Sequence, residues 1–174
     1  IDKAYIDLLK RFRVVDYSYS NLEILESIGV NNAFCFGFGF TKMTCHAFPS
    51  RYGPLTFYGK VTERRAETLN NLISEGVQVR VVDGVWGYER DFIVATSKAI
   101  LNLSKLKSSP LEVYRIWHSL CLGVPVISER GSDAVLYKKW KDYILAPERL
   151  ISTCKNHDYD FCLLYTSPSP RDGL

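Results

Sequence analysis

Short apolar runs that alternate with amphipathic segments from residue 55 onward constrain the fold of this chain most strongly. The segments between these runs carry apolar residues at helical spacing, and glycines follow several of them. Strands that alternate with helices in this way predict an α/β fold with a Rossmann-like, doubly wound parallel sheet. The expected strands are 55–58, 77–82, 99–103, 124–127 and 143–146, and the expected helices are 62–75, 88–97, 111–122 and 147–154.

The beginning of the chain shows one further unit of the same kind. A helix is expected over 4–12, a strand at 14–15, a second helix that Ser20 or Asn21 caps, and a strand at 33–36. Two strands do not form a stable domain alone. We therefore expect 1–36 to be the truncated end of a preceding α/β domain. Residues 37–54, which are rich in glycine and proline, are expected to be an interdomain linker, and 55–161 a second domain.

The last stretch differs in kind from the rest. Residues 162–172 read CLLYTSPSPRD, which resembles the translation of a transposase-type sequencing adapter. The alternative is a genuine Ser/Pro-rich tail. We interpret 162–174 as an artefactual tail and exclude it from reasoning about the fold.

Composition and charge exclude several classes of protein. The chain is 47% hydrophobic and 24% charged, which is ordinary for a globular protein. Its net charge of +3 is small and evenly spread, so we expect no nucleic-acid partner. No apolar run approaches the roughly 20 residues of a transmembrane helix. The five cysteines form no C-x-x-C pair, which favours reduced thiols and a cytoplasmic location. His46 beside Cys45 has too few neighbouring ligands for a metal site.

The segment 111–129 is the strongest candidate for a functional site. Apolar residues such as Val113 and Ile116 form one face of the expected helix, and Glu112, Arg115 and Ser119 share the opposite face. A carboxylate at a helix start can accept ribose hydroxyls while the free N–H groups face a pyrophosphate. An ordinary glutamate that complements the helix dipole is the alternative. Glu129 follows the strand at 124–127, at the end where parallel sheets bind ligands.

A second candidate surrounds Gly59, the tight turn after the strand at 55–58. Arg64 and Arg65 follow at the start of the next helix, where N–H groups and guanidinium groups favour phosphate. A solvated basic first turn is the alternative. The residues match neither the dinucleotide fingerprint nor the P-loop. Thr62 is a candidate cap for this helix, and the residues expected to face inward are Ala66, Leu69, Leu72 and Ile73.

Four more residues complete the candidates. Arg90 either contacts ligand or pairs with its neighbours in the chain, and Asn102 at the end of a buried strand needs a partner. Trp86 either stacks on a base or packs in the core or a hinge. His118 is interpreted as a packing or surface residue and not as a catalytic one.

Several short motifs together resemble the carboxyl-terminal domain of GT-B glycosyltransferases, above all bacterial enzymes of the spore-maturation and family-1-like type. The motifs are F-Y-G-K at 57–60, G-V-W-G-Y-E-R-D at 84–91, A-I-L-N-L at 99–103, E-V-Y-R at 112–115 and G-V-P-V-I-S-E at 123–129. Residues 16–30 resemble the end of the amino-terminal domain of these enzymes. The resemblance covers about 1–151.

The resemblance implies transfer of a sugar from a nucleotide-sugar donor to a glycan, protein or lipid acceptor, without a metal or another cofactor. Residues 1–36 then belong to the acceptor-side domain and 55–161 to the donor-binding domain. Gly59 and Arg65 line the phosphate side, Glu112 and Arg115 the donor side, and Glu129 the cleft. Many relatives carry E-x7-E, but Leu120 occupies the second position here. Catalytic residues are not assigned, and a general base is expected from the amino-terminal half.

Two other functions remain open from the sequence. A non-catalytic nucleotide-binding domain can share this fold, because fold alone does not decide function. A different α/β enzyme, of flavodoxin-like or epimerase type, would bind its ligand at another switch point.

Overall fold

A computed structural model describes residues 2–38, 52–141, 144 and 150–156. The tail at 162–174 lies outside these residues, as do most of the expected linker and the expected strand at 143–146 apart from Ile144. None of the described helices has the length and apolar character needed to cross a bilayer.

The amino-terminal part is a small α/β unit around two parallel strands. It comprises α1 (Lys3–Arg11), β1 (Val14–Asp16), α2 (Tyr19–Ser27) and β2 (Ala33–Cys35). The predicted helix and strand order is confirmed, but the predicted cap of α2 is wrong. Ser18 is the N-cap, because its hydroxyl accepts the Asn21 N–H at 3.3 Å.

The larger part is a four-stranded sheet in which all pairs are parallel. Its strands are β3 (Leu55–Tyr58), β4 (Val79–Val82), β5 (Ile100–Asn102) and β6 (Val126–Ser128), in the order β4-β3-β5-β6. Its helices are α3 (Glu63–Ser74), α4 (Gly87–Ala95), α5 (Val113–Cys121), α6 (Ala134–Trp140) and α7 (Leu150–Asn156). This parallel, Rossmann-like α/β arrangement agrees with the predicted fold class.

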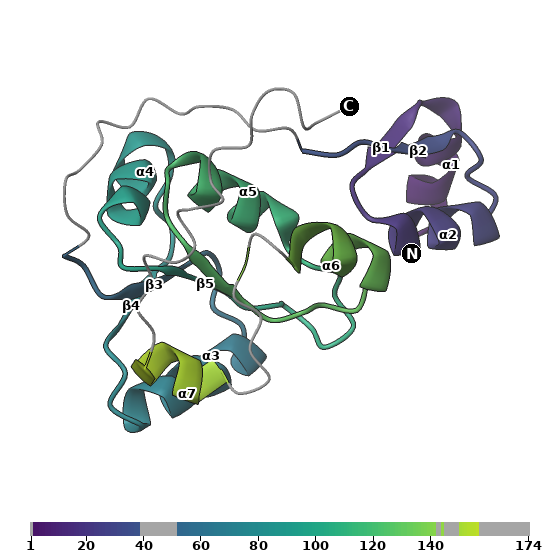
Figure 1. The fold of residues 1–174 in the computed structure, drawn as a ribbon. Helices are drawn as coiled ribbons and strands as arrows, with labels where there is room; N and C mark the ends of the chain where they lie inside the picture. Colours follow the sequence, from purple (N-terminus) through teal and green to yellow (C-terminus); the bar gives the residue numbers. More distant parts are fainter. Residues whose placement is uncertain (1, 39–51, 142–143, 145–149, 157–174) are drawn as a thin grey trace.

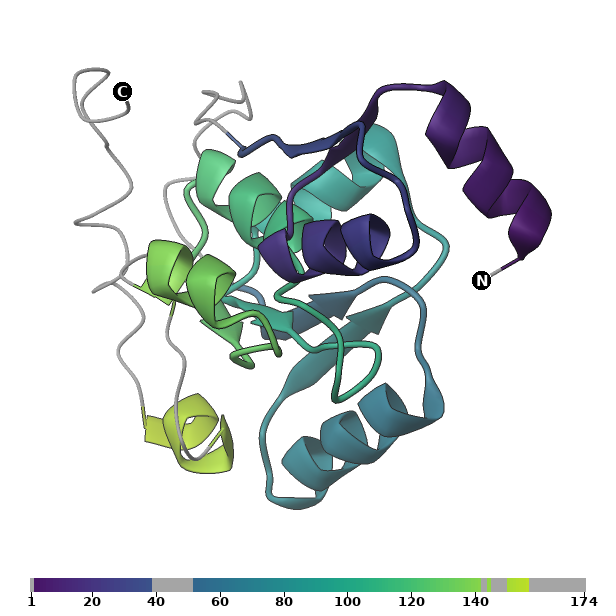
Figure 2. The same ribbon diagram turned by 90° about the vertical axis from the view of Figure 1, so that its right-hand side faces the viewer.

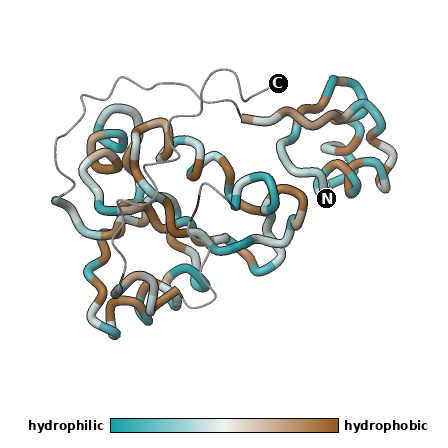
Figure 3. Tube along the Cα trace, in the orientation of Figure 1, coloured by the Kyte–Doolittle hydropathy of each residue, from teal (hydrophilic) through white to brown (hydrophobic). Residues whose placement is uncertain are grey.

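Helices cover both faces of this sheet (Figure 1). Alternate residues of a strand point to opposite faces, so Phe57 packs toward α3 and α7 while Tyr58 packs toward α4, α5 and α6. Ile100 and Leu101 divide between the two cores in the same way. The central strands are therefore buried on both faces and mostly apolar, and Figure 3 shows brown, hydrophobic residues in this region.

The buried stripe of α3 differs from the one predicted. Leu69 and Leu72 are buried as expected, but Ile73 is 49% exposed and Arg65 is buried. Positions 65, 69 and 72 lie on one side of a helix, which turns Ile73 toward solvent. Thr62 is the N-cap residue, but its side chain makes no capping hydrogen bond.

The short helix α6 was not predicted, although its N-cap, Asp133, is of a favoured type. Asp133 also joins the two parts of the protein, which lie side by side at this point (Figures 1 and 2). Its Oδ1 accepts the Leu136 N–H at 2.8 Å, while its Oδ2 accepts the Ser18 hydroxyl at 2.8 Å and the Ser20 hydroxyl at 3.1 Å. One buried carboxylate thus serves the first turns of two helices, α6 and α2.

We expect Asp133→Ala to lower the free energy of unfolding by about 2 kcal/mol in urea denaturation. A lost N-cap costs about 1 kcal/mol, and leaving the buried Ser18 hydroxyl without its acceptor costs about 1 kcal/mol or more. Asp133→Ser is the matched control, since serine still caps α6 but is too short to replace the carboxylate, and it should cost about half as much. Equal stability of Asp133→Ser and wild type would show that the contact with Ser18 contributes nothing.

Candidate functional site

The predicted site residues other than Arg90 gather where the order of the strands reverses. The chain passes from β3 to β4 on one side and then returns to β5 on the other side of β3. In open parallel sheets the carboxyl ends of the two strands at such a reversal form the crevice that binds ligands. Here these ends carry Tyr58–Gly59 and Asn102, and the amino-terminal end of α5 brings Glu112 and Arg115 to the same place.

Arg115 occupies this crevice and is almost completely buried. Its Nε donates to the Tyr58 carbonyl at 3.1 Å and its Nη1 to Asn102 Oδ1 at 2.6 Å, while Nη1 also forms an ion pair with Glu112 Oε2 at 2.8 Å. The guanidinium carbon also lies 5.4 Å from the centre of the Tyr58 ring. The contacts with the ends of β3 and β5 and with the Tyr58 ring together fix the plane of the Arg115 guanidinium group.

Asn102 has the partners that the sequence requires of a buried amide. Its Oδ1 accepts from Arg115, and its Nδ2 donates to the Ser128 hydroxyl on the neighbouring strand at 2.9 Å. The amide orientation is thereby determined, because only the oxygen can accept from a guanidinium.

Glu112 holds two arginines together. Its Oε1 accepts from Arg65 Nη2 and from the Lys105 N–H at 3.2 Å, while its Oε2 forms an ion pair with Arg115. Glu112 is the N-cap residue of α5, but its side chain makes no capping hydrogen bond with that helix. Its position is therefore set by the guanidinium groups and not by capping.

Arg65 lies deeper than a phosphate-binding residue in a first helical turn would. Its Nε donates to the Leu103 carbonyl at 3.0 Å and its Nη1 to the Lys60 carbonyl at 2.9 Å. Burial lowers the pKa of Arg65, and Glu112 partly offsets this effect. The donors of Arg65 bind the Leu103 and Lys60 carbonyls and Glu112. Arg65 therefore stabilises the position of Glu112 and does not itself face a ligand.

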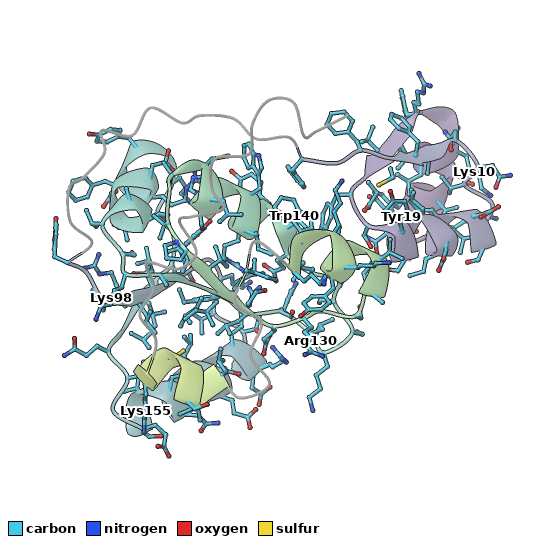
Figure 4. The ribbon with its side chains drawn as sticks, in the orientation of Figure 1. Lys10, Tyr19, Lys98, Arg130, Trp140 and Lys155 are labelled. Carbon is cyan, nitrogen blue, oxygen red and sulfur yellow. The ribbon has the colours of Figure 1, made fainter. Side chains whose placement is uncertain are left out.

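Arg64 forms a second, more exposed pair with Glu129. Two parallel contacts join them, Nη2 to Oε1 at 2.7 Å and Nη1 to Oε2 at 3.0 Å. The Ser104 backbone binds both members of this pair: its N–H donates to Glu129 and its carbonyl accepts from Arg64. The hydrogen bond to Glu129 raises the pKa of Arg64. Arg130, labelled in Figure 4, takes no part in this pair and lies over the Tyr137 ring at 5.4 Å.

The cluster carries an uncompensated positive charge. The guanidinium groups of Arg64, Arg65 and Arg115 face two carboxylates, Glu112 and Glu129. Within the described part of the chain, no acceptor contacts Arg115 Nη2. This nitrogen lies beside Gly59, where a Cβ atom would come within 3.2 Å of it. Gly59 has φ +119°, which favours glycine, so no side chain at position 59 crowds the guanidinium group.

A separate buried network contains Arg90, which the structure does not bring into the cluster. Both Nε and Nη2 of Arg90 contact Asp91 Oδ1, at 3.0 and 2.8 Å. The same oxygen lies 2.8 Å from His118 Nε2, and His118 Nδ1 lies 3.0 Å from the Tyr58 hydroxyl. Arg90 therefore balances a partly buried carboxylate, which is the structural alternative considered for it.

His118 is buried and held in its neutral form. Burial, and then the charge of Arg90, lower the pKa of His118, and the bond to Asp91 offsets this only in part. Burial also raises the pKa of Tyr58 to about 12, so its hydroxyl keeps its proton. The interpretation of His118 as a packing residue agrees with its burial, although all of its polar atoms have partners.

We expect the stability of the protein to fall as the pH is lowered through the range 7.5 to 5. An unfolded histidine binds a proton below about pH 6.5, whereas the folded His118 binds one only at lower pH. The unfolded state therefore holds more protons in this window, so acid favours unfolding. The melting temperatures of wild type and His118→Gln, measured across this pH range, test this prediction, because only wild type should lose stability through His118 as the pH falls. Parallel curves for the two proteins would contradict it.

The structure also decides several single-residue alternatives. Trp86 follows β4 and is 78% exposed, so it does not pack in the core. Its ring is accessible for stacking on a base. Leu120 is buried in the core, so it offers no polar group to a ligand. Arg115 and Ser119 were expected on a face opposite the apolar one, but both are buried, because α5 is packed on both sides.

Sequence reasoning missed one contributor to the site, Tyr58, which reads as an apolar strand residue. The sequence already indicates that Asp91, together with Arg90, either contacts ligand or caps the helix and pairs, and the structure shows the pair. Only the buried His118 offered a signal, since a histidine in an apolar helix requires polar partners.

No protein-family model matches the chain, and no curated protein is significantly similar to it. Among the described residues, no three histidine, cysteine or carboxylate side chains lie together in a way that could hold a metal ion.

Proposed function

We propose that this chain binds a nucleotide sugar at the crevice between β3 and β5 and is the donor-binding part of a GT-B glycosyltransferase. The observation that supports this most is Arg115, whose guanidinium group is fixed by three protein acceptors while its Nη2 is uncommitted beside Gly59. A fixed cation in a crevice at a strand reversal suits the diphosphate of a nucleotide. The doubly wound sheet of GT-B enzymes accords with the reversed strand order and the helices on both faces.

The chemistry follows from the charge at this position. When a sugar leaves its nucleoside diphosphate, negative charge develops on the bridging phosphate oxygen. A preorganised guanidinium in a partly dehydrated crevice stabilises that charge without a metal ion. The acceptor is a glycan, protein or lipid that the amino-terminal part would hold, and a general base would come from the same side.

A non-catalytic nucleotide-binding domain of the same fold is the second candidate. It shares the anion site, and nothing in Glu112, Glu129 or their arginine partners distinguishes it from an enzyme. Only turnover does so, by release of nucleoside diphosphate from a nucleotide sugar in the presence of acceptors.

The test is a thermal-shift panel of UDP, GDP, dTDP and ADP against the full chain, with Arg115→Lys as the site variant. Lysine keeps the charge but cannot reproduce the fixed fork of contacts. Lys98→Met is the matched control, because Lys98 is exposed before β5, at the opposite end of the sheet (Figure 4). One nucleotide should stabilise wild type and Lys98→Met but not Arg115→Lys. An unchanged melting temperature with all four nucleotides would refute the proposal.

A further inference from the structure

A chain of polar groups, partly buried at Asp91 and buried at His118 and Tyr58, leads from α4 to the end of β3 and stops at Arg115. Asp91 on α4 contacts His118 on α5, and His118 contacts the hydroxyl of Tyr58. His118 lies one helical turn after Arg115, so both side chains reach the same strand residue from one helix. The Tyr114 ring, 5.9 Å away and 11° from parallel, covers the imidazole.

The direction of each hydrogen bond in this chain follows from the chemistry of the groups. Asp91 is paired with Arg90 and is an acceptor only, so His118 Nε2 carries the ring proton. In the neutral ring Nδ1 is then an acceptor, and the Tyr58 hydroxyl donates to it at 3.0 Å. His118 therefore has a defined donor and a defined acceptor, and the Tyr58 hydroxyl also lies 3.5 Å from the Arg115 carbonyl, a second and longer contact with α5.

Tyr58 is held at both ends by α5. Its hydroxyl is bound by His118, its carbonyl accepts from Arg115 Nε, and its ring lies under the same guanidinium group. Tyr58 is also the last residue of β3, directly before the glycine turn. A shift of the Tyr58 side chain would move the carbonyl that orients Arg115.

We propose that Asp91, His118 and Tyr58 form a positioning relay that sets the direction of the Arg115 guanidinium group. The three residues touch no ligand in this scheme; they act through Arg115. The consequence for anion binding rests on the proposed function, but the orientation of Arg115 does not and can be measured without any ligand.

The first experiment measures the exchange of the Arg115 Nε–H proton with water by ¹⁵N NMR, with the signal assigned by its loss in Arg115→Lys. Tyr58→Phe removes only the hydroxyl, and His118→Gln keeps a donor for Asp91 but has no acceptor at the position of Nδ1, which Tyr58 contacts. We expect exchange to be about tenfold faster in both variants, as for the loss of one buried hydrogen bond. Tyr137→Phe is the matched control, because its hydroxyl lies on α6 outside the relay, and it should leave the rate unchanged.

The second experiment titrates pyrophosphate and the four nucleoside diphosphates into the same proteins by calorimetry. Affinity should fall about fivefold to tenfold in Tyr58→Phe and His118→Gln and stay unchanged in Tyr137→Phe. Unchanged exchange of Arg115 Nε–H in both relay variants would overturn the relay, whatever the ligands do. If wild type binds neither pyrophosphate nor any nucleotide, the proposed function fails, and the exchange rates still decide the relay.

Discussion

Replacing Arg115 by alanine should lower the free energy of unfolding by about 3 kcal/mol, the largest effect expected for a single substitution in this site. Removing one partner of a buried ion pair leaves the other partner without compensation. Here Glu112 loses one of its two guanidinium contacts and Asn102 loses its strongest donor. The Tyr58 carbonyl loses its contact with Arg115 as well.

Urea denaturation of wild type, Arg115→Ala and Arg115→Lys measures this effect. Lysine retains the charge and one contact at a time, so its cost should lie between those of wild type and alanine. Lys98→Met removes a positive charge from the surface and should change stability by no more than about 0.5 kcal/mol. A cost below about 1 kcal/mol for Arg115→Ala would show that the network does not depend on Arg115.

Replacing Glu112 by glutamine should have the second largest effect, a loss of about 1–3 kcal/mol of stability. Two arginines, one of them deeply buried, then lack their shared carboxylate. The effect is smaller than for Arg115, because the Glu112 side chain is 26% exposed and solvent screens its charge.

The same substitution separates the two roles considered for Glu112. If Glu112 only balances the arginines, Glu112→Gln leaves more uncompensated positive charge, and pyrophosphate should bind more tightly. If Glu112 also accepts ribose hydroxyls, the variant should gain affinity for pyrophosphate but lose affinity for a nucleoside diphosphate. Calorimetric titration with both ligands distinguishes these outcomes. Weaker binding of pyrophosphate would contradict both, and would mean that Glu112 matters chiefly by holding Arg115 in place.

Local signals were sufficient for the elements that surround the site. Gly59 was expected at a tight turn and has φ +119°, and Gly123, which follows an expected helix, has φ +71° as in a left-handed helix cap. The strand at 55–58 has the predicted bounds, because the strand-favouring run Leu-Thr-Phe-Tyr ends at a glycine. Asn102 was expected to require a partner and has two. Each of these expectations depends on a few neighbouring residues only.

The adjacent residues Arg64 and Arg65 show what neighbouring residues in the sequence do not predict, namely the partners of a side chain. Arg64 and Arg65 differ by one position, about 100° around a helix, and the sequence assigns both to a basic first turn. In the structure the buried Arg65 side chain forms an ion pair with Glu112, whereas the more exposed Arg64 side chain forms one with Glu129. Their carboxylate partners lie 47 and 65 positions along the chain.

The sequence by itself determined the parallel α/β architecture, since the alternation of apolar runs and amphipathic helices is a property of neighbouring residues. Only the tertiary structure decided which polar groups are buried together at the reversal of the strands. The partners of Arg115 come from β3, β5 and the start of α5, and those of His118 from α4 and β3. Such pairs form because the order β4-β3-β5-β6 brings distant strand ends to one edge, and a buried charge is stable only where that order supplies its counter-charge.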